Sequence, residues 1–133
     1  MKLLIITNPN CTQCKKLFME GVCDGYDTEL VLIPQVQTDE HLFRIIWSTE
    51  NPKLTFQEML MSNEITQLVD FNIDITDKVK NNFDMINKLN AIDQIIQTPM
   101  FYIDDGIQIK SIKIPELDIK NLIKNNMEKV NVL

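Results

Sequence analysis

Two cysteines near the start of the chain have the spacing of a redox-active pair. Cys11 and Cys14 are separated by two residues, and the apolar run Leu3–Ile6 comes before them. This run predicts a buried strand, and the residues at 7–10, Thr-Asn-Pro-Asn, break it with turn formers. Helical spacing of apolar residues begins after the cysteines. The pattern therefore predicts a strand, a turn and a helix, with Cys11 at the helix N-terminus.

This placement suits Cys11 to act as a nucleophile. The unpaired N–H groups at a helix start carry a positive pole of roughly half a charge. A cysteine held there can have its pKa lowered from about 8.5 to between roughly 3.5 and 7.5, and only the thiolate attacks a disulfide. Cys14, one turn later, is within reach and can close a disulfide. Cys11 is therefore the candidate nucleophile and Cys14 the candidate resolving thiol.

Other interpretations of the cysteines remain open. A C-x-x-C pair can be half of a zinc site, or two unrelated thiols. Cys23 and His41 could complete a Cys₃His zinc site, although the strand-to-helix setting favours redox chemistry. Three cysteines fit one redox pair and one spare thiol better than a disulfide scaffold. We therefore expect no metal and no cofactor, a semi-buried Cys23, and His41 at or near the surface.

Several other side chains favour structure over chemistry. The residues before Cys11 also resemble the loop of arsenate reductases, but an oxyanion site should have several arginines, and Arg44 is alone. Aromatic residues at helical spacing among aliphatic neighbours predict core packing, whereas two aspartates predict solvated helix positions. These residues are Trp47, Phe56 and Phe83, and Asp84 and Asp93.

Composition narrows the function classes further. The chain has 133 residues, the size of one domain, and a net charge of −6. Its twelve lysines are spread out, so a nucleic-acid interface is not expected. No apolar run approaches the length of a membrane span. The apolar run after Lys2 is too short for a signal peptide, so we expect a cytoplasmic protein, or an exported one if a leader has been trimmed.

Strand and helix patterns alternate in the first part of the chain. The helix that carries the cysteines is expected over about 12–20, with Gly21 and Gly25 at its end. The aliphatic stretch 28–34 predicts a second strand. A strand, a helix and a strand so close together make a βαβ unit, in which the two strands are parallel.

Between 38 and 96 the apolar spacing is helical. Thr38 can cap a first helix that has Asp39 and Glu40 in its first turn, and a second segment covers 54–61. A third helix starts at 74–77, and its apolar residues are Val79, Phe83, Ile86 and Leu89.

Two strands are expected near the end of the chain, at 99–103 and 107–112. The Asp104-Asp105-Gly106 turn between them is a strong hairpin signal. A last helix is expected from Pro115, a favourable first-turn residue.

This order of elements resembles the thioredoxin fold: β-α-β, a helical insertion, then β-β-α, in a three-layer α/β/α architecture. The chain is interpreted as one thioredoxin-like domain, 1–133, with the insertion over 38–96. The insertion resembles that of the Dsb group of bacterial disulfide oxidoreductases and isomerases, especially the catalytic domain of the periplasmic isomerase. The matching segments are Ile5–Cys14, Ile46-Trp47, Thr55-Phe56, Asp74–Asp77 and Thr98–Gly106.

The resemblance implies a thiol–disulfide oxidoreductase that reduces, forms or isomerises protein disulfides, in a direction left open. Its partners would be protein or peptide thiols and disulfides, with a redox protein or glutathione to recycle it, and a monomer is expected. The resemblance also implies that the Thr98–Pro99 peptide bond is cis, beside the C-x-x-C, and that Thr98 and Pro99 hold an extended substrate. Cis costs about 0.5–1 kcal/mol before proline.

Rival functions belong to a different class. One is a thioredoxin-like domain that binds a partner without turnover, and the other is a Cys/His zinc-binding domain. A periplasmic location would follow if the chain is a trimmed Dsb-type protein.

Overall fold

The computed structural model describes residues 2–19, 21, 27–62, 64–95 and 98–112. The predictions made for Cys23, for Gly25 and for a helix from Pro115 lie outside these residues. Within them, none of the helices is long and apolar enough to cross a membrane.

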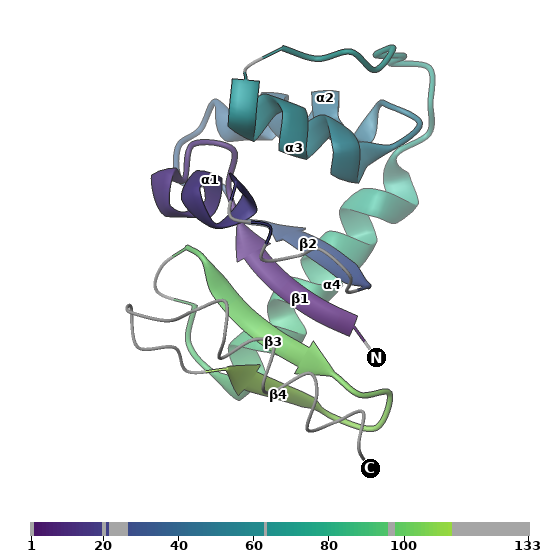
Figure 1. Ribbon diagram of the computed structural model, residues 1–133. Helices are drawn as coiled ribbons and strands as arrows, with labels where there is room; N and C mark the ends of the chain where they lie inside the picture. Colours follow the sequence, from purple (N-terminus) through teal and green to yellow (C-terminus); the bar gives the residue numbers. More distant parts are fainter. Residues whose placement is uncertain (1, 20, 22–26, 63, 96–97, 113–133) are drawn as a thin grey trace.

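One sheet of four strands organises the described residues, with β1 and β3 in the middle and the order β2-β1-β3-β4 (Figure 1). β1 pairs with β2 in parallel, whereas β3 runs antiparallel to both β1 and β4. The predicted parallel pair and hairpin are therefore confirmed. The strands are β1 (Lys2–Thr7), β2 (Thr28–Leu32), β3 (Met100–Asp104) and β4 (Ile109–Ile112).

The apolar run of β1 is buried on both faces, which explains why it has no polar alternation. Successive side chains of a strand point to opposite faces. Leu3 and Ile5 pack with Leu17 on one face, and Leu4 and Ile6 contribute to the cluster on the other. All four strand residues are at most 1% exposed.

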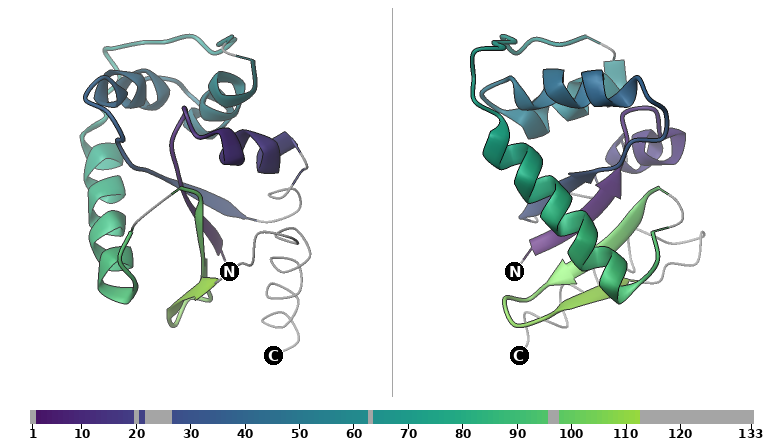
Figure 2. Two further views of the ribbon diagram at one scale, coloured as in Figure 1. Left: turned by 90° about the vertical axis from the view of Figure 1, so that its left-hand side faces the viewer. Right: turned by 180° about the vertical axis from the view of Figure 1, so that it is seen from behind.

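A helix covers each face, giving three layers (Figure 2, left). Helix α1 (Thr12–Met19) carries Leu17 into the first cluster, and α4 (Thr76–Ile92) carries Leu89 into the second. The predicted α/β/α arrangement is therefore confirmed for the described residues.

Helices α2 (Asp39–Trp47) and α3 (Pro52–Ser62) lie beyond the end of the sheet at which β1 and β2 finish (Figure 1). Their buried side chains, including Phe43 and Phe56, form a third cluster together with Leu32 of β2. The helical content predicted between β2 and β3 is thus confirmed, with α3 beginning at Pro52, a position that suits proline.

The predicted role of Thr38 as a helix cap is wrong. Its side chain makes no capping hydrogen bond, and its backbone is already helical, with φ −68° and ψ −15°. The carboxylate of Asp39 instead accepts hydrogen bonds from the backbone N–H groups of Gln35 and Val36. Asp39 therefore closes the loop before α2, which leaves Thr38 exposed.

The predicted core position of Phe83 is also wrong, although Phe56 is fully buried and Trp47 is half-buried. Phe83 is 62% exposed. The cause is the rotation of α4 about its axis, which turns Asn82 toward β2. The Asn82 amide pairs with both the N–H and the C=O of Leu32, at 2.8 and 2.9 Å.

Strand β4 is shorter than predicted. The Asp105 carboxylate accepts hydrogen bonds from the N–H groups of Ile107 and Gln108, both at 2.8 Å. Gly106 has φ +89°, a conformation that glycine adopts readily. These features extend the turn, so that Ile107 is 94% exposed and the strand begins at Ile109.

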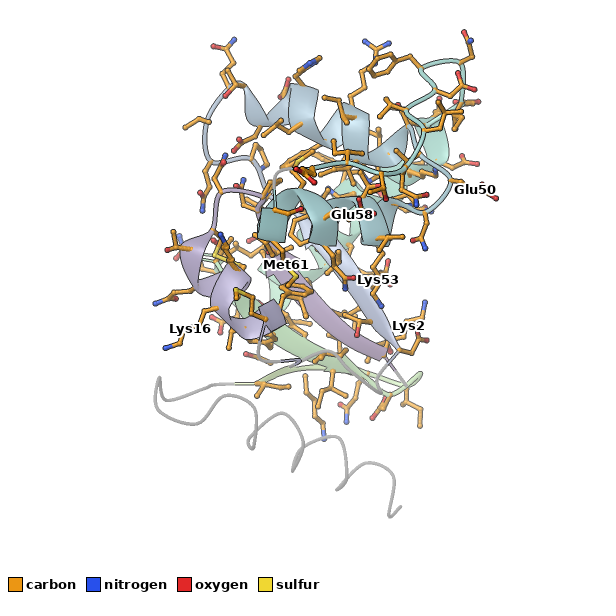
Figure 3. The ribbon with its side chains drawn as sticks, turned by 45° about the horizontal axis from the view of Figure 1, so that its top comes forward. Lys2, Lys16, Glu50, Lys53, Glu58 and Met61 are labelled. Atoms are coloured by element: carbon orange, nitrogen blue, oxygen red, sulfur yellow. A yellow bond between two sulfur atoms is a disulfide. The ribbon has the colours of Figure 1, made fainter. Side chains whose placement is uncertain are left out.

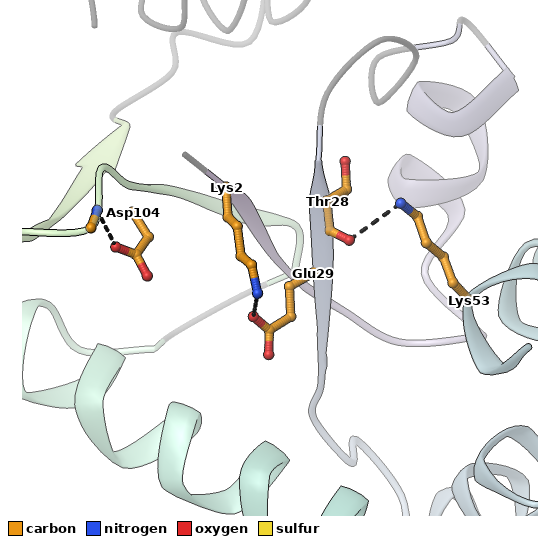
Figure 4. A network of polar contacts seen from close by, with 6 residues as sticks. Lys2, Thr28, Glu29, Lys53 and Asp104 are labelled. Carbon is orange, nitrogen blue, oxygen red and sulfur yellow. Dashed lines mark hydrogen bonds and ion pairs between the residues drawn. The ribbon is translucent and has the colours of Figure 1, made fainter.

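β2 is an edge strand, and side chains from α3 and α4 form hydrogen bonds with its outward-facing backbone groups. Figure 3 shows Lys2 and Lys53 on the side of the molecule where this edge lies. Lys53 Nζ donates to the Thr28 carbonyl at 3.2 Å, and Lys2 Nζ pairs with Glu29 at 3.7 Å (Figure 4). Together with Asn82 at the other end, Lys53 occupies groups that could otherwise pair with a foreign strand.

Replacing Leu89 by alanine should destabilise the protein strongly. The side chain is fully buried between α4 and the sheet, and such a truncation costs about 2–5 kcal/mol. Phe83→Ala, in the same helix, is the matched control and should change the free energy of unfolding by less than about 0.5 kcal/mol, as exposed sites do. Urea denaturation measures both. Equal losses would contradict the orientation of α4.

Candidate active site

A turn stabilised by Asn8 presents Cys11 at the start of α1. The Cys11 N–H donates to the Asn8 backbone carbonyl at 3.0 Å. The Asn10 N–H donates to Asn8 Oδ1 at 2.8 Å, which makes an Asx turn. The predicted turn is therefore confirmed, and it carries the chain from the end of β1 into the helix within a few residues.

The two sulfurs of the pair are joined by a disulfide. Both cysteines are buried, but Cys11 is 8% exposed and Cys14 is 0% exposed, so Cys11 is the more accessible of the two. The Cys14 N–H points at Cys11 Sγ at 3.2 Å. A donor in this position stabilises a thiolate relative to a thiol, as does the helix N-terminus.

Apolar side chains from α2 and α3 surround the cysteines. Phe18 of α1 and Phe56 of α3 meet edge to face, with ring centroids 5.8 Å apart. Lys16 of α1 and Met61 of α3, both labelled in Figure 3, are exposed. The buried cluster that contains both cysteines also includes Leu32, Phe43, Ile46, Phe56, Met59 and Leu60.

The Thr98–Pro99 peptide bond is cis, as the resemblance implied. Ile6 of β1 pairs with Met100 of β3 in antiparallel register. The residues before β3 therefore lie at the same end of the sheet as the turn after β1. The structure thus brings Cys11, Cys14, Thr98 and Pro99 to one end of the sheet, while their roles stay predictions.

Asp39 is the residue of this region that the sequence did not single out for chemistry. It is 0% exposed, and its carboxylate accepts four hydrogen bonds. Asn10 Nδ2 donates to Oδ1 at 3.1 Å, and Asn8 Nδ2 donates to Oδ2 at 2.9 Å. Gln35 and Val36 donate their backbone N–H groups to Oδ2 at 2.8 and 3.1 Å.

These hydrogen bonds keep Asp39 ionised. Burial by itself raises the pKa of the carboxyl, but the hydrogen bonds from Asn8, Gln35, Val36 and Asn10 outweigh it and lower the pKa below 3.8. The sequence showed the turn-forming residues Asn8 and Asn10. It did not show that their side-chain amides donate to Asp39, about thirty residues away in the chain.

Other candidate residues lie away from metal or acid–base arrangements. His41 is exposed on α2, and the Arg44 guanidinium lies over the Phe71 ring at 5.1 Å. Asp84 is exposed as predicted, but Asp93 is half-buried. Burial, and then the charge of Asp93, raises the pKa of Tyr102. In the described part of the chain, no three His, Cys, Asp or Glu side chains could hold a metal ion.

The stability that Asp39 contributes should be lost in acid. Its pKa is lower in the folded protein than the ordinary 3.8, so the unfolded chain takes up the proton more readily. The contribution is fully present above the unfolded pKa and is lost as the pH falls through the folded pKa. The difference in unfolding free energy between the wild-type protein and Asp39→Asn, from urea denaturation, should be constant near neutrality and shrink below about pH 4. A difference that grew as the pH fell below about 4 would contradict this.

Comparison with known proteins gives the fold a context. No protein-family model and no curated protein matches this chain. Among solved structures, it is similar to the crystal structure of a disulfide interchange protein from Neisseria gonorrhoeae. The TM-score is 0.60 at 14% sequence identity, and the match covers 95% of this chain and 87% of that one. Identity this low supports an inference about fold alone, and this chain has the predicted thioredoxin-like fold.

Proposed function

We propose that this protein is a thiol–disulfide oxidoreductase that exchanges disulfides with protein or peptide substrates through Cys11 and Cys14. The observation that carries the proposal is the bonded C-x-x-C pair at the start of α1, in which Cys11 is 8% exposed and Cys14 is fully buried. The fold, which is similar to that of a disulfide interchange protein, is compatible with this activity.

The reaction needs two exchanges. In the reduced protein, the Cys11 thiolate attacks one sulfur of a substrate disulfide. A Cys11–substrate disulfide forms, the substrate S–S bond breaks, and the departing sulfur leaves as a thiolate that takes a proton. Cys14, deprotonated in turn, then attacks Cys11 Sγ and releases the second substrate thiol. The substrate disulfide gains two electrons and two protons, and the protein dithiol is oxidised to the disulfide.

Run backwards, the same steps oxidise a substrate dithiol and reduce the Cys11–Cys14 disulfide. The direction depends on the reduction potential of the pair and on the redox partner, a protein or glutathione, that restores it. Burial suits Cys14 to the resolving step, because the sulfur that it attacks is the neighbouring Cys11 Sγ and no substrate sulfur has to reach it.

We further propose that Thr98 and Pro99 bind the substrate backbone. Pro99 has no N–H, so its own backbone can only accept a hydrogen bond there. The antiparallel register of β3 with β1 puts this loop at the same end of the sheet as the turn before Cys11. A substrate strand held there would be next to the nucleophile.

Variants of the two cysteines test the activity, in a Cys23→Ser background that removes the third thiol. Reduced Cys14→Ser should accumulate a mixed disulfide with a peptide disulfide, because Cys11 can attack but no resolving thiol follows. Cys11→Ser should form none, since Cys14 is enclosed. Mass spectrometry of the intact protein after acid quenching measures both species.

The parent Cys23→Ser protein is the control and should form the Cys11–Cys14 disulfide while releasing reduced peptide. Equal trapping by Cys11→Ser and Cys14→Ser would overturn the assigned roles. A parent protein that neither reduces the peptide nor oxidises a reduced one would overturn the oxidoreductase and favour a module that binds without turnover.

A further inference from the structure

A hydrogen-bond network centred on Asp39 connects the two loops of the candidate active site. On one side, Asn10 and Asn8 of the Cys11 turn donate to the two carboxylate oxygens of Asp39. On the other, the Gln35 backbone N–H donates to the same carboxylate. The Gln35 side chain then donates from Nε2 to Thr98 Oγ1 at 3.0 Å.

Three segments that are distant in sequence are held by this network. Asn8 Nδ2 also donates to the Ile33 carbonyl at 2.8 Å, so it binds the end of β1 to the loop after β2. Gln35 and Val36 are four and three residues from Asp39, but the other bonded partners are 25 to 63 residues apart along the chain. No local preference of the backbone could therefore set the distance between the Cys11 turn and the Thr98–Pro99 loop.

The hydrogen bonds to Asp39 indicate that this residue positions the groups around it and does not merely fill space. A fully buried carboxylate costs free energy, and an apolar side chain would fill the same space without that cost. The carboxylate has one property that an apolar side chain lacks: it can accept from four converging N–H groups at once. This capacity fixes the directions of those donors relative to each other.

We propose that Asp39 and Gln35 are positioning residues that set the Cys11 turn and the Thr98–Pro99 loop at the separation an extended peptide disulfide requires. This inference rests on the proposed function and adds two positioning residues to it. A peptide must contact the Thr98–Pro99 backbone and reach Cys11 at the same time, so its rate depends on how the loops are placed. A small disulfide has to reach Cys11 alone.

The ratio of two rate constants tests this proposal. The fully reduced, full-length protein is mixed with a peptide disulfide, or with hydroxyethyl disulfide, and the second-order rate constant of each reaction is measured at one pH. Any change in the pKa of Cys11 alters the thiolate fraction equally for both substrates and so cancels in the ratio. A change in the separation of the two loops lowers the rate constant for the peptide disulfide and leaves the rate constant for hydroxyethyl disulfide unchanged.

Gln35→Ala removes the bond to Thr98 and leaves the backbone contact with Asp39. The ratio of peptide to small-disulfide rate should fall about three- to tenfold, the range expected when one hydrogen bond is lost. Gln37→Ala is the matched control, because Gln37 is an exposed glutamine two residues along the same loop. Its ratio should equal that of the wild-type protein.

Asp39→Asn leaves one acceptor oxygen and places an NH₂ group against one set of donors. If the remaining oxygen takes the place of Oδ2, which accepts from Asn8, Gln35 and Val36, the NH₂ group faces Asn10 and the Asn10 contact is lost. Asp39→Asn and Asn10→Ala should then lower the ratio of the two rate constants alike. The double variant should be no worse than either single variant, because both break one contact. Glu40→Gln, the adjacent exposed carboxylate on α2, is the control for loss of charge.

The outcomes separate the two proposals. If wild-type protein reacts with neither disulfide, the proposed function fails. If it reacts with both, and Gln35→Ala and Asn10→Ala keep the wild-type ratio, the positioning role is overturned while the oxidoreductase stands. Gln35→Ala is an exposed change outside the core, so this second result is decisive even if Asp39→Asn does not fold.

Discussion

The burial of β1 on both faces is the constraint on which the rest of the structure depends. A strand with four successive apolar side chains, Leu3–Ile6, must be covered on both sides, so a helix lies on each face of the sheet. The central strand must also end abruptly, because the chain has to leave the sheet where helices α2 and α3 cover its end. The C-x-x-C pair follows at that exit, where a helix begins.

The exit from β1 creates a second requirement, because its polar groups are enclosed. Asn8 is 0% exposed, and both ends of its amide are used: Oδ1 accepts within the turn, and Nδ2 donates to Ile33 and to Asp39. A buried amide left without these partners would cost about 1–3 kcal/mol. The polar network and the apolar cluster around the cysteines therefore share one turn, in which polar contacts set direction and apolar contacts exclude water.

Local patterns in the sequence were enough to predict the parts of the site that depend on neighbours in the chain. The turn after β1, the helix after Cys11 and the hairpin at Gly106 each follow from a few adjacent residues, and all are present. The cis bond before Pro99 came from the resemblance. The extent of the domain and of its insertion, 1–133 and 38–96, stays a prediction.

The features that were missed depend on partners far away in the chain. The exposure of Phe83 follows from the bonds between Asn82 and Leu32, which are 50 residues apart. Because helical spacing fixes which residues share a face but leaves open which face meets the sheet, the pattern in α4 could not decide between Phe83 and its neighbours. Asp39 was missed for the same reason. An aspartate in the first turn of a helix is already explained by the helix dipole, so nothing in its local sequence indicates hydrogen-bond donors elsewhere in the chain.

The same dependence on distant contacts explains how the proposed site could be selective. Cys11 is 8% exposed, and the walls beside it come from α2 and α3. A substrate disulfide must approach along the line of the bond that breaks, so only one that projects from an extended or deformable segment can reach such a sulfur. A disulfide inside a well-packed domain would have to leave that domain first. In the proposed reaction, the apolar walls and the low exposure of Cys11 would thus favour accessible disulfides before any side chain of the substrate is recognised.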